Sequence, residues 1–359
     1  MKKKLRVAII GQGRSGRDIH GKHLLTDTAR FTIVAVADEL ADRRERAVRE
    51  YGCEAYAGYE QLLSRHDIDL VVNASFSHQH GPITTDLLRH GFNVLVEKPA
   101  ARSPEELDGM IEAARESGRM LAIFQQSRFA PYFEKVQQIL RSGVLGRPVQ
   151  ISISFSGFAR RWDWQCCRDM NGGSLFNTGP HPLDQALQLL DYPGMPNVFC
   201  RMDRANTFGD AEDYVKLILT APDRPVIDLV ISSCDAYPEC TYRIQATRGG
   251  LKGTMTRIDW RWYSEAEAPP QRLTRQPLST PEGLPAYCSE KMVWIEESWQ
   301  SPDARVFSYG TRRLYDTVYD HLAHGTPLVV TPEQVRQQLA VIAACHAQNP
   351  LPPINVEEQ

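Results

Sequence analysis

Five short apolar runs recur through the first 124 residues, with helix-type segments between them. The runs are LRVAII, FTIVAVAD, LVVNAS, NVLVEK and MLAIF, which begin at Leu5, Phe31, Leu70, Asn93 and Met120. Continuous apolar character over roughly four to eight residues is typical of strands buried on both faces. The segment SPEELDGMIEAARESG has a serine N-cap, a proline at the first helical position and a closing glycine. Alternating strands and helices predict a parallel, doubly wound α/β sheet.

The pattern changes after residue 124. A helix candidate at 131–143 leads into VQISISFSGF, in which apolar residues and serines alternate, and this predicts a strand covered on one face only. Further strand candidates are NVFCRMDR, DYVKLILTA, VIDLVISS, YRIQAT and LKGTMTRIDW. Helices are expected near 309–323 and 332–347, and 265–285 is a long surface excursion. We therefore predict a doubly wound domain over residues 1–124 and an α/β domain with a large, mostly antiparallel open sheet over 125–359.

Composition narrows the range of partners. Apolar residues make up 42% and charged residues 24%, and the formal net charge of −3 gives no reason to expect nucleic acid or an anionic membrane as partner. The apolar run near the N-terminus is too short for a signal peptide, and no run of about 20 apolar residues occurs, so we expect a cytoplasmic protein. The eight cysteines lack CxxC spacing, which favours reduced thiols. HGKH and HQH lack nearby carboxylates or thiols, so we expect no metal.

A G-x-G-x-x-G motif follows the first apolar run. The first glycine permits a tight turn, the second lets the backbone approach a pyrophosphate, and the third lets helix and strand pack closely. A helix expected from Ser15 onward offers free N–H groups and a positive dipole end to phosphates. A purely structural turn is the alternative. The candidate cofactor-binding residues of this loop are Gly11, Gln12, Gly13, Arg14, Ser15 and Gly16.

Asp38 ends the second apolar run, 22 residues after Gly16. A carboxylate at this point hydrogen-bonds the hydroxyls of the adenosine ribose and repels a 2′-phosphate. Arg43 and Arg44 would attract such a phosphate, and solvated helix charges are the alternative for them. We therefore predict NAD as the cofactor, with NADP disfavoured.

Glu97-Lys98-Pro99 ends the fourth apolar run. Ligands of open α/β sheets bind beyond the carboxyl ends of the strands, so Lys98 is expected to project towards the nicotinamide end of the cleft. A solvated lysine is the alternative. Pro99 is a candidate for a cis peptide.

His181 stands between two prolines in FNTGPHPLDQ, with Asn177 before it and Asp184 after it. The apolar phase from Leu183 predicts a helix that begins near Pro182, and proline is tolerated in a first turn. A helix cap with an incidental histidine is the alternative to an acid–base centre.

Taken together, these motifs resemble the glucose–fructose oxidoreductase/inositol dehydrogenase/MocA (Gfo/Idh/MocA) family, over nearly the whole chain. The combination of EKP with a later G-x-H-x-x-D carries most of the resemblance. It implies a Rossmann domain and a C-terminal α/β domain whose open sheet forms a homodimer or homotetramer. It also implies NAD(P)-dependent oxidation or reduction of a sugar, glycoside or cyclitol.

By position, Lys98 and His181 match the family's catalytic lysine and histidine, and Asp184 matches an aspartate that often contacts substrate. Ser75 and His80 fall at positions on the cofactor side, and with Glu97 and Lys98 they are further candidates for cofactor binding. The chain departs from the family at Asn177, where an aspartate is common, and at Phe76, where a proline is frequent.

Oxidation of a secondary alcohol needs a hydride acceptor, a base and positioning of both. Neutral His181 is the favoured base, with Lys98 stabilising alkoxide charge, and the swapped roles stay open. Asn177 supplies no charge, so His181 should be less basic than it would be beside an aspartate.

The segment FARRWDWQCC precedes this motif. Trp162 and Trp164 are expected to stack on a sugar ring and Arg161 to reach its hydroxyls, while a hydrophobic anchor is an equal alternative. Arg128 is a further candidate for the cleft. The leading hypothesis is an NAD-dependent dehydrogenase. Its rivals are a redox-neutral, glycoside-cleaving enzyme with tightly bound NAD and a non-catalytic NAD-responsive regulator.

Overall fold

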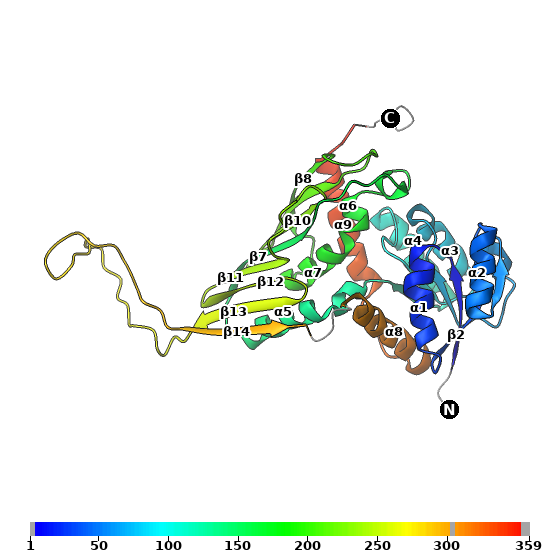
Figure 1. The fold of residues 1–359 in the computed structure, drawn as a ribbon, viewed down its shortest axis with the longest axis horizontal. Helices are drawn as coiled ribbons and strands as arrows, with labels where there is room; N and C mark the ends of the chain where they lie inside the picture. Colours follow the sequence, from blue (N-terminus) through cyan, green and yellow to red (C-terminus); the bar gives the residue numbers. More distant parts are fainter. Residues whose placement is uncertain (1–3, 302–305, 353–359) are drawn as a thin grey trace.

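The computed structural model describes residues 4–301 and 306–352. The chain forms two sheets with helices around and between them (Figure 1). Residues 1–3 of the basic N-terminal segment and residues 302–305 and 353–359 of the expected second domain lie outside the described residues. Within the described ranges, no helix has both the length and the apolar character needed to cross a membrane.

The first sheet contains six parallel strands in the order β3-β2-β1-β4-β5-β6. The strands are β1 (Leu5–Ile10), β2 (Phe31–Ala37), β3 (Glu54–Tyr56), β4 (Leu70–Asn73), β5 (Val94–Val96) and β6 (Leu121–Ile123). Each of the five apolar runs contains one of these strands, which confirms the doubly wound sheet. The three-residue β3 was not predicted, because it is too short to show a pattern and its residues are not buried.

The helices of this half are α1 (Lys22–Thr26), α2 (Ala41–Tyr51), α3 (His80–Arg89) and α4 (Pro104–Ser117), with short 3₁₀ turns η2 (Tyr59–Leu62) and η3 (Ser77–Gln79). The predicted cap of α4 is confirmed, since the Ser103 side chain accepts a hydrogen bond from the Glu106 amide. The helix expected from Ser15 is a π-helix, η1 (Arg14–Gly21), which continues as α1. The prediction of an ordinary α-helix there was wrong in helix type, and the helix begins one residue before the predicted Ser15.

The second sheet contains eight strands in the order β14-β13-β12-β11-β7-β10-β9-β8, and neighbours are antiparallel except β7 and β10. This confirms the large, mostly antiparallel sheet. On β7, Ile151 and Ile153 are buried and the serines between and beyond them are partly exposed, as predicted. The strands are β7 (Pro148–Ser156), β8 (Asn197–Asp203), β9 (Tyr214–Thr220), β10 (Val226–Ser232), β11 (Tyr242–Ala246), β12 (Gly249–Gly253), β13 (Arg257–Tyr263) and β14 (Trp294–Gln300).

Two parts of the second sheet differ from expectation. LKGTMTRIDW is a hairpin of β12 and β13 and not one strand, because Thr254 makes a turn: its amide donates to the Arg257 carbonyl and its hydroxyl accepts from the amides of Thr256 and Arg257. Strand β14 was not predicted, since nearly all of its side chains are exposed and no alternation marks it. Between β13 and β14, residues 264–293 form a long arm that projects away from the rest of the molecule (Figure 1).

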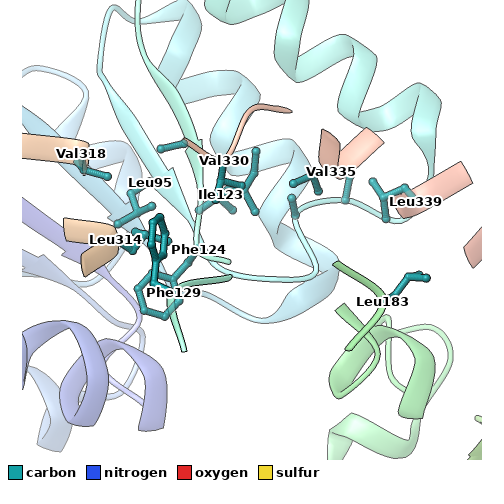
Figure 2. Close-up of a cluster of buried hydrophobic side chains, with 14 of the residues drawn as sticks. Leu95, Ile123, Phe124, Phe129, Leu183, Leu314, Val318, Val330, Val335 and Leu339 are labelled. Carbon is teal, nitrogen blue, oxygen red and sulfur yellow. The ribbon is translucent and has the colours of Figure 1, made fainter. Parts of the chain in front are cut away.

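The remaining helices follow β6 in the chain, and two of them pack on the first half. They are α5 (Pro131–Ser142), α6 (Ser174–Asn177), α7 (Pro180–Leu190), α8 (Val306–His324) and α9 (Pro332–Gln348), with 3₁₀ turns η4 (Gln126–Phe129) and η5 (Trp164–Cys166). Helix α8 contacts α1, and α9 contacts α4 and β6. Figure 2 shows the resulting core, in which Leu314 of α8 and Val335 of α9 lie near Leu95 and Ile123 of the first sheet. Because these C-terminal helices pack on the first sheet, the division at residue 124 stays a prediction.

Candidate active site

The glycine-rich loop follows β1, and its glycines have different reasons to be glycine. Gly11 has φ +83°, and a Cβ there would overlap the Ala74 carbonyl oxygen. A Cβ on Gly16 would overlap the Gly11 carbonyl oxygen. A Cβ on Gly13 would meet only the Arg43 guanidinium, at 3.6 Å. Gly11 and Gly16 are therefore required by the packing of the loop, whereas Gly13 has an open face that a dinucleotide can approach.

Other groups of this loop also fit a dinucleotide. The side chain of Gln12 is buried, and neither its amide nitrogen nor its oxygen has a hydrogen-bond partner among the described residues. Arg46 fixes the backbone of the same residue by donating to the Gln12 carbonyl at 2.7 Å. Arg14 and Ser15 begin η1, with Arg14 exposed. An unpaired buried amide beside an open glycine face suits a ligand rich in hydrogen-bonding groups.

Asp38 lies beside this loop, just past β2. Its Oδ2 accepts a hydrogen bond from the backbone amide of Gln12 at 2.6 Å, and its Oδ1 accepts one from the backbone amide of Leu40 at 2.9 Å. The nearest guanidinium nitrogen of Arg43 is 3.5 Å from Oδ2, and Arg44 donates to the Asp38 carbonyl. The carboxylate therefore also fixes the backbone of the glycine-rich loop at Gln12, a contact that the sequence did not predict. Its contact with ribose stays a prediction.

His80 connects two loops at the carboxyl ends of β4 and β5. Its Nε2 lies 3.1 Å from the Ser75 carbonyl, and its Nδ1 lies 2.7 Å from the Pro99 carbonyl. The ring is buried, and burial lowers the pKa of His80. The peptide bond between Lys98 and Pro99 is cis, as the sequence indicated. Ser75 and His80 thus lie beside the EKP turn, where the cofactor side of the cleft was expected.

Lys98 reaches from this turn to the second half of the chain. Its Nζ donates a hydrogen bond to the backbone carbonyl of Asn177 at 2.7 Å. Asn177 is the last residue of α6, and His181 lies in the first turn of α7, which begins at Pro180 and not near Pro182. Nδ1 of His181 is 3.2 Å from the Ser127 hydroxyl. The structure therefore brings together Lys98, Asn177 and His181, the three predicted catalytic residues.

The charges around this cluster set its protonation. Burial lowers the pKa of His181 to about 3; the charge of Lys98 acts in the same direction, and Glu97 opposes it. Burial also lowers the pKa of Lys98; Glu97 raises it, and the charges of Arg14 and Arg161 lower it further. At neutral pH the imidazole is therefore uncharged.

Glu97 belongs to a buried network that no motif in the sequence indicated. Its Oε2 accepts a hydrogen bond from the Lys98 amide at 3.0 Å, and its Oε1 lies 3.2 Å from Nε2 of His20. Nδ1 of His20 lies 2.8 Å from the hydroxyl of Tyr315, on α8. The sequence marks His20 only as part of HGKH, a weak candidate for metal binding. In the described part of the chain, no group of three or more His, Cys, Asp or Glu residues is placed to hold a metal.

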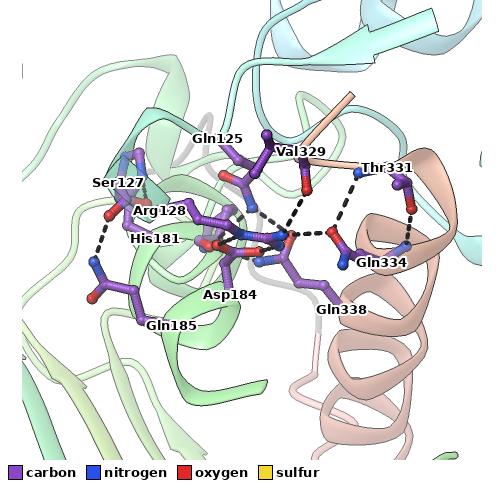
Figure 3. Close-up of polar contacts among 11 residues, drawn as sticks. Gln125, Ser127, Arg128, His181, Asp184, Gln185, Val329, Thr331, Gln334 and Gln338 are labelled. Carbon is purple, nitrogen blue, oxygen red and sulfur yellow. Dashed lines mark hydrogen bonds and ion pairs between the residues drawn. The ribbon is translucent and has the colours of Figure 1, made fainter. Parts of the chain in front are cut away.

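Arg128 and Asp184 form a buried ion pair, with exposures of 7% and 3%. Arg128 donates to both carboxylate oxygens and also to the Gln334 side chain and the Val329 carbonyl (Figure 3). Because both charged groups are engaged within the protein, the arrangement favours a role in holding α7 against α9. Contact of Asp184 or Arg128 with substrate stays a prediction.

Three glutamines position the start of α7, and no motif marked them. Nε2 of Gln125 and Nε2 of Gln338 both donate to the Pro180 carbonyl, at 3.1 and 2.6 Å. Gln185 donates to the Ser127 carbonyl at 2.8 Å. Figure 3 shows these side chains around His181. The ring is therefore carried on a helix start that is fixed by buried hydrogen bonds.

The segment with two tryptophans separates into different environments. Trp164 makes an edge contact with Phe76, with ring centroids 5.2 Å apart, so it faces the loop after β4. Trp162 is 79% exposed. Arg161 is exposed, and its charge acts on Lys98. Sugar stacking therefore stays a prediction for both tryptophans, with Trp164 nearer the cofactor side.

Two family models and several known proteins match this chain. Residues 5–125 match the oxidoreductase family with an NAD-binding Rossmann fold, and residues 133–252 match the GFO/IDH/MocA C-terminal domain. The chain is 29% identical over 201 residues to D-glucoside 3-dehydrogenase of Escherichia coli, which covers 54% of this chain and 56% of that relative. It is 26% identical over 256 residues to 2,7-anhydro-N-acetylneuraminate hydratase of Mediterraneibacter gnavus, which covers 68% of this chain and 66% of that relative.

A solved structure has the same fold. The WlbA dehydrogenase from Bordetella pertussis, in complex with NADH and UDP-GlcNAcA, superimposes with a TM-score of 0.76 at 18% identity, over 96% of this chain and 95% of that chain. The family matches together span more than half of the sequence. The chain therefore belongs to the GFO/IDH/MocA family of oxidoreductases, and its N-terminal domain is the NAD-binding Rossmann domain of that family.

Proposed function

We propose that this protein transfers a hydride between NAD and a ring hydroxyl or ketone of a sugar, glycoside or cyclitol. The observation that carries the proposal is the contact of Lys98 with Asn177, which joins the carboxyl edge of the Rossmann sheet to the end of α6, directly before the helix that bears His181. D-glucoside 3-dehydrogenase, one of the relatives, supports a carbohydrate substrate.

The residues of this chain divide the work. The loop from Gly11 to Gly16 and the carboxylate of Asp38 would hold the dinucleotide, which accepts or donates the hydride at C4 of its nicotinamide ring. Lys98 and His181 hold the reacting oxygen of the substrate between them, and their positions are fixed by backbone carbonyls and buried amides. Trp164 lines the side of the cleft next to the loop after β4, where it contacts Phe76.

We assign the role of the base, which takes the proton of the substrate hydroxyl, to Lys98. This reverses the preference for His181 drawn from the sequence. Protonation of His181 would place an imidazolium beside the Lys98 ammonium, and burial already lowers the pKa of the ring to about 3. A neutral Lys98 amine becomes an ammonium next to the Glu97 carboxylate and the Asn177 carbonyl, which both stabilise it. His181 then supplies a hydrogen bond to the substrate oxygen.

The pH dependence separates the two assignments. Oxidation requires a deprotonated base, so kcat/KM should rise with pH through the pKa of that base. With Lys98 as the base, the rise lies below the ordinary lysine pKa of 10.5, because burial lowers the pKa of Lys98, and above the pKa of about 3 to which burial brings His181. A rate that is already maximal near pH 6 would return the role to His181.

The function is tested by following NADH absorbance with a panel of monosaccharides, inositols and glycosides. Lys98→Met and His181→Ala should each abolish turnover while NAD still binds. Turnover by the double variant would refute the mechanism, and NAD binding without any turnover across the panel would favour a regulator.

A redox-neutral reaction is the second candidate, because one relative is a hydratase, an enzyme that adds or removes water with no net oxidation. In this case tightly bound NAD would accept the hydride from the hydroxyl, the substituent would leave by elimination, water would add in its place, and the NADH formed would return the hydride, so that no net oxidation occurs. Incubation with aryl glycosides distinguishes the two. Free aglycone without accumulation of NADH supports the redox-neutral reaction, and NADH in step with substrate loss supports the dehydrogenase.

The protein is further proposed to be a homodimer or homotetramer assembled through its second sheet and arm. Leu273 and Tyr287 on the arm are 92% and 97% exposed, and Phe199 on β8 is 59% exposed. Exposed apolar groups on a ribbon without a core of its own are typical of an association surface. Light scattering should give a dimer or larger for the full chain and a smaller species when residues 266–291 are replaced by a short turn. A monomeric full chain would contradict the proposal.

A further inference from the structure

The carboxylate of Glu97 is shared between the catalytic lysine and a histidine from another part of the fold. One oxygen accepts the hydrogen bond of the Lys98 amide, and the other faces Nε2 of His20 at 3.2 Å. His20 lies on η1, directly after the glycine-rich loop, and its other nitrogen faces Tyr315 of α8 at 2.8 Å. Both His20 and Tyr315 are fully buried. One network therefore joins the cofactor-binding helix, the EKP turn and a helix from the C-terminal part of the chain.

The chemistry of the groups assigns the hydrogens. Burial raises the pKa of Glu97, but the interactions with His20 and Lys98 outweigh it and bring the pKa to about 2, so the carboxylate is ionised and only accepts. Nε2 of His20 therefore carries the hydrogen. Burial raises the pKa of Tyr315 well above its usual value, so its hydroxyl keeps its hydrogen, and its oxygen lies 2.8 Å from Nδ1 of His20. Each group in this chain of contacts therefore has a hydrogen-bond partner.

The charge of Glu97 acts directly on Lys98. Glu97 raises the pKa of Lys98, against burial and against the charges of Arg14 and Arg161. The other titratable groups that face this pair are His80 on α3 and His181 on α7. His20 donates to the carboxylate oxygen that the backbone amide of Lys98 does not contact, so its N–H helps to keep the carboxylate ionised and oriented.

We propose that His20 is a positioning residue for Lys98, acting through Glu97. It rests on the proposed function, because Lys98 exchanges a proton with substrate only if the protein is an oxidoreductase of this kind. Without the His20 N–H, Glu97 loses a partner that stabilises its charge and fixes its orientation. The negative charge beside Lys98 is then held less firmly in place, so the ammonium form of Lys98 is less stable in its buried site. Because η1 follows the glycine-rich loop, the same contact ties the cofactor-binding helix to the lysine.

Four variants and a control test this role. His20→Leu removes the ring and both hydrogen bonds, whereas His20→Gln keeps an N–H donor for Glu97. Glu97→Gln removes the charge itself, and Tyr315→Phe removes only the outer hydroxyl. His23→Leu is the matched control, since the His23 ring packs on Tyr315 with centroids 4.5 Å apart but does not contact Glu97.

The primary measurement is the pH dependence of Lys98 labelling by trace acetic anhydride in the protein without added substrate, followed by peptide mass spectrometry. The labelling midpoint in His20→Leu should fall by about one pH unit or more, towards that of Glu97→Gln, because a nearby opposite charge shifts a pKa by roughly 1–3 units. The midpoint of His20→Gln should be close to that of the wild type. The midpoint of Tyr315→Phe should lie between those of His20→Leu and the wild type. His23→Leu should leave the midpoint unchanged even where it lowers thermal stability.

An unchanged midpoint in His20→Leu and in Tyr315→Phe would overturn the proposal. Equal shifts in His20→Leu, His20→Gln and His23→Leu would also overturn it, since they would reflect general disruption. If His20→Leu does not fold, the labelling midpoints of His20→Gln and Tyr315→Phe are compared with that of Glu97→Gln instead. The labelling result does not require turnover, so failure of this inference is distinct from absence of dehydrogenase activity across the substrate panel.

Discussion

Gly13→Ala should separate cofactor binding from folding. The backbone of Gly13 is extended, with φ −73° and ψ −157°, a conformation open to alanine. The added Cβ would meet only the Arg43 guanidinium at 3.6 Å, an ordinary van der Waals contact. The folded state therefore accepts the methyl group, and the unfolded chain loses freedom. The free energy of unfolding should stay the same or rise by about 0.4–1 kcal/mol.

The cofactor should respond in the opposite direction. The open face of Gly13 is the one through which the motif lets backbone amides approach a pyrophosphate. A methyl group there holds the phosphate away from the loop. Loss of one hydrogen bond to a charged group is worth about 1.5–3 kcal/mol, so NAD should bind roughly 10- to 150-fold more weakly.

The assay pairs urea unfolding without cofactor with calorimetric titration of NAD. Gly52→Ala is the control, because Gly52 has φ +65° and no atom lies within 4 Å of the point that an added Cβ would occupy, so strain alone should cost about 1–2 kcal/mol and leave NAD affinity unchanged. Gly11→Ala should destabilise the fold more than the control, because it adds a backbone clash. Unchanged NAD affinity in Gly13→Ala, or a clear loss of its stability, would refute the assignment of this face to the cofactor.

Three further predictions concern charge. Asp38→Ser should weaken NAD about tenfold and improve NADP, because Arg43, 3.5 Å from the carboxylate, is then free to bind a 2′-phosphate; competitive titration of both cofactors measures the change. Asn177→Asp adds a negative charge near Lys98 and His181, so it should raise both pKa values and move the acidic limb of kcat/KM for oxidation to higher pH; an unchanged limb excludes tuning from this position. The pKa of His181 is near 3 in the folded state and near 6.5 when unfolded, so the unfolded chain binds more protons between these values. Stability should therefore fall as pH drops from 6.5 towards 3, and by less in His181→Gln, as urea midpoints at pH 7 and 5 would show.

The Rossmann half was predictable because its local signals agree with its tertiary contacts. A strand buried on both faces must be apolar throughout, and LRVAII and LVVN satisfy this requirement with complete burial of nearly every residue. Gly11 and Gly16 were predictable for the same reason, since close backbone approach at both and a positive φ at Gly11 exclude other residues. Strand β14 shows the converse, because an exposed edge strand needs no alternation and leaves no pattern to read.

The contacts around the site were less predictable because they join residues far apart in sequence. His20 meets Tyr315 across 295 positions, and Arg128 meets Asp184 across 56. Each is an ordinary polar residue in its local segment, and only the packing of α7 and α8 against the first half makes it a partner. Asp184 could be located by its spacing from His181, but its ion pair with Arg128 could not be inferred from spacing alone.

Asn177 gains a clearer meaning from the contact with Lys98. That contact uses the backbone carbonyl, which any residue supplies, so an asparagine in place of the family's common aspartate preserves the hydrogen bond and removes only a charge. Around His181, Glu97 then opposes burial and the charge of Lys98, and the pKa of the ring still falls to about 3. Glu97 is the residue directly before Lys98; it accepts from the backbone amide of Lys98 and contacts His20. Glu97 therefore opposes burial at both groups but adjoins only Lys98 in the chain, which supports the proposal that the proton taken from substrate is held by Lys98.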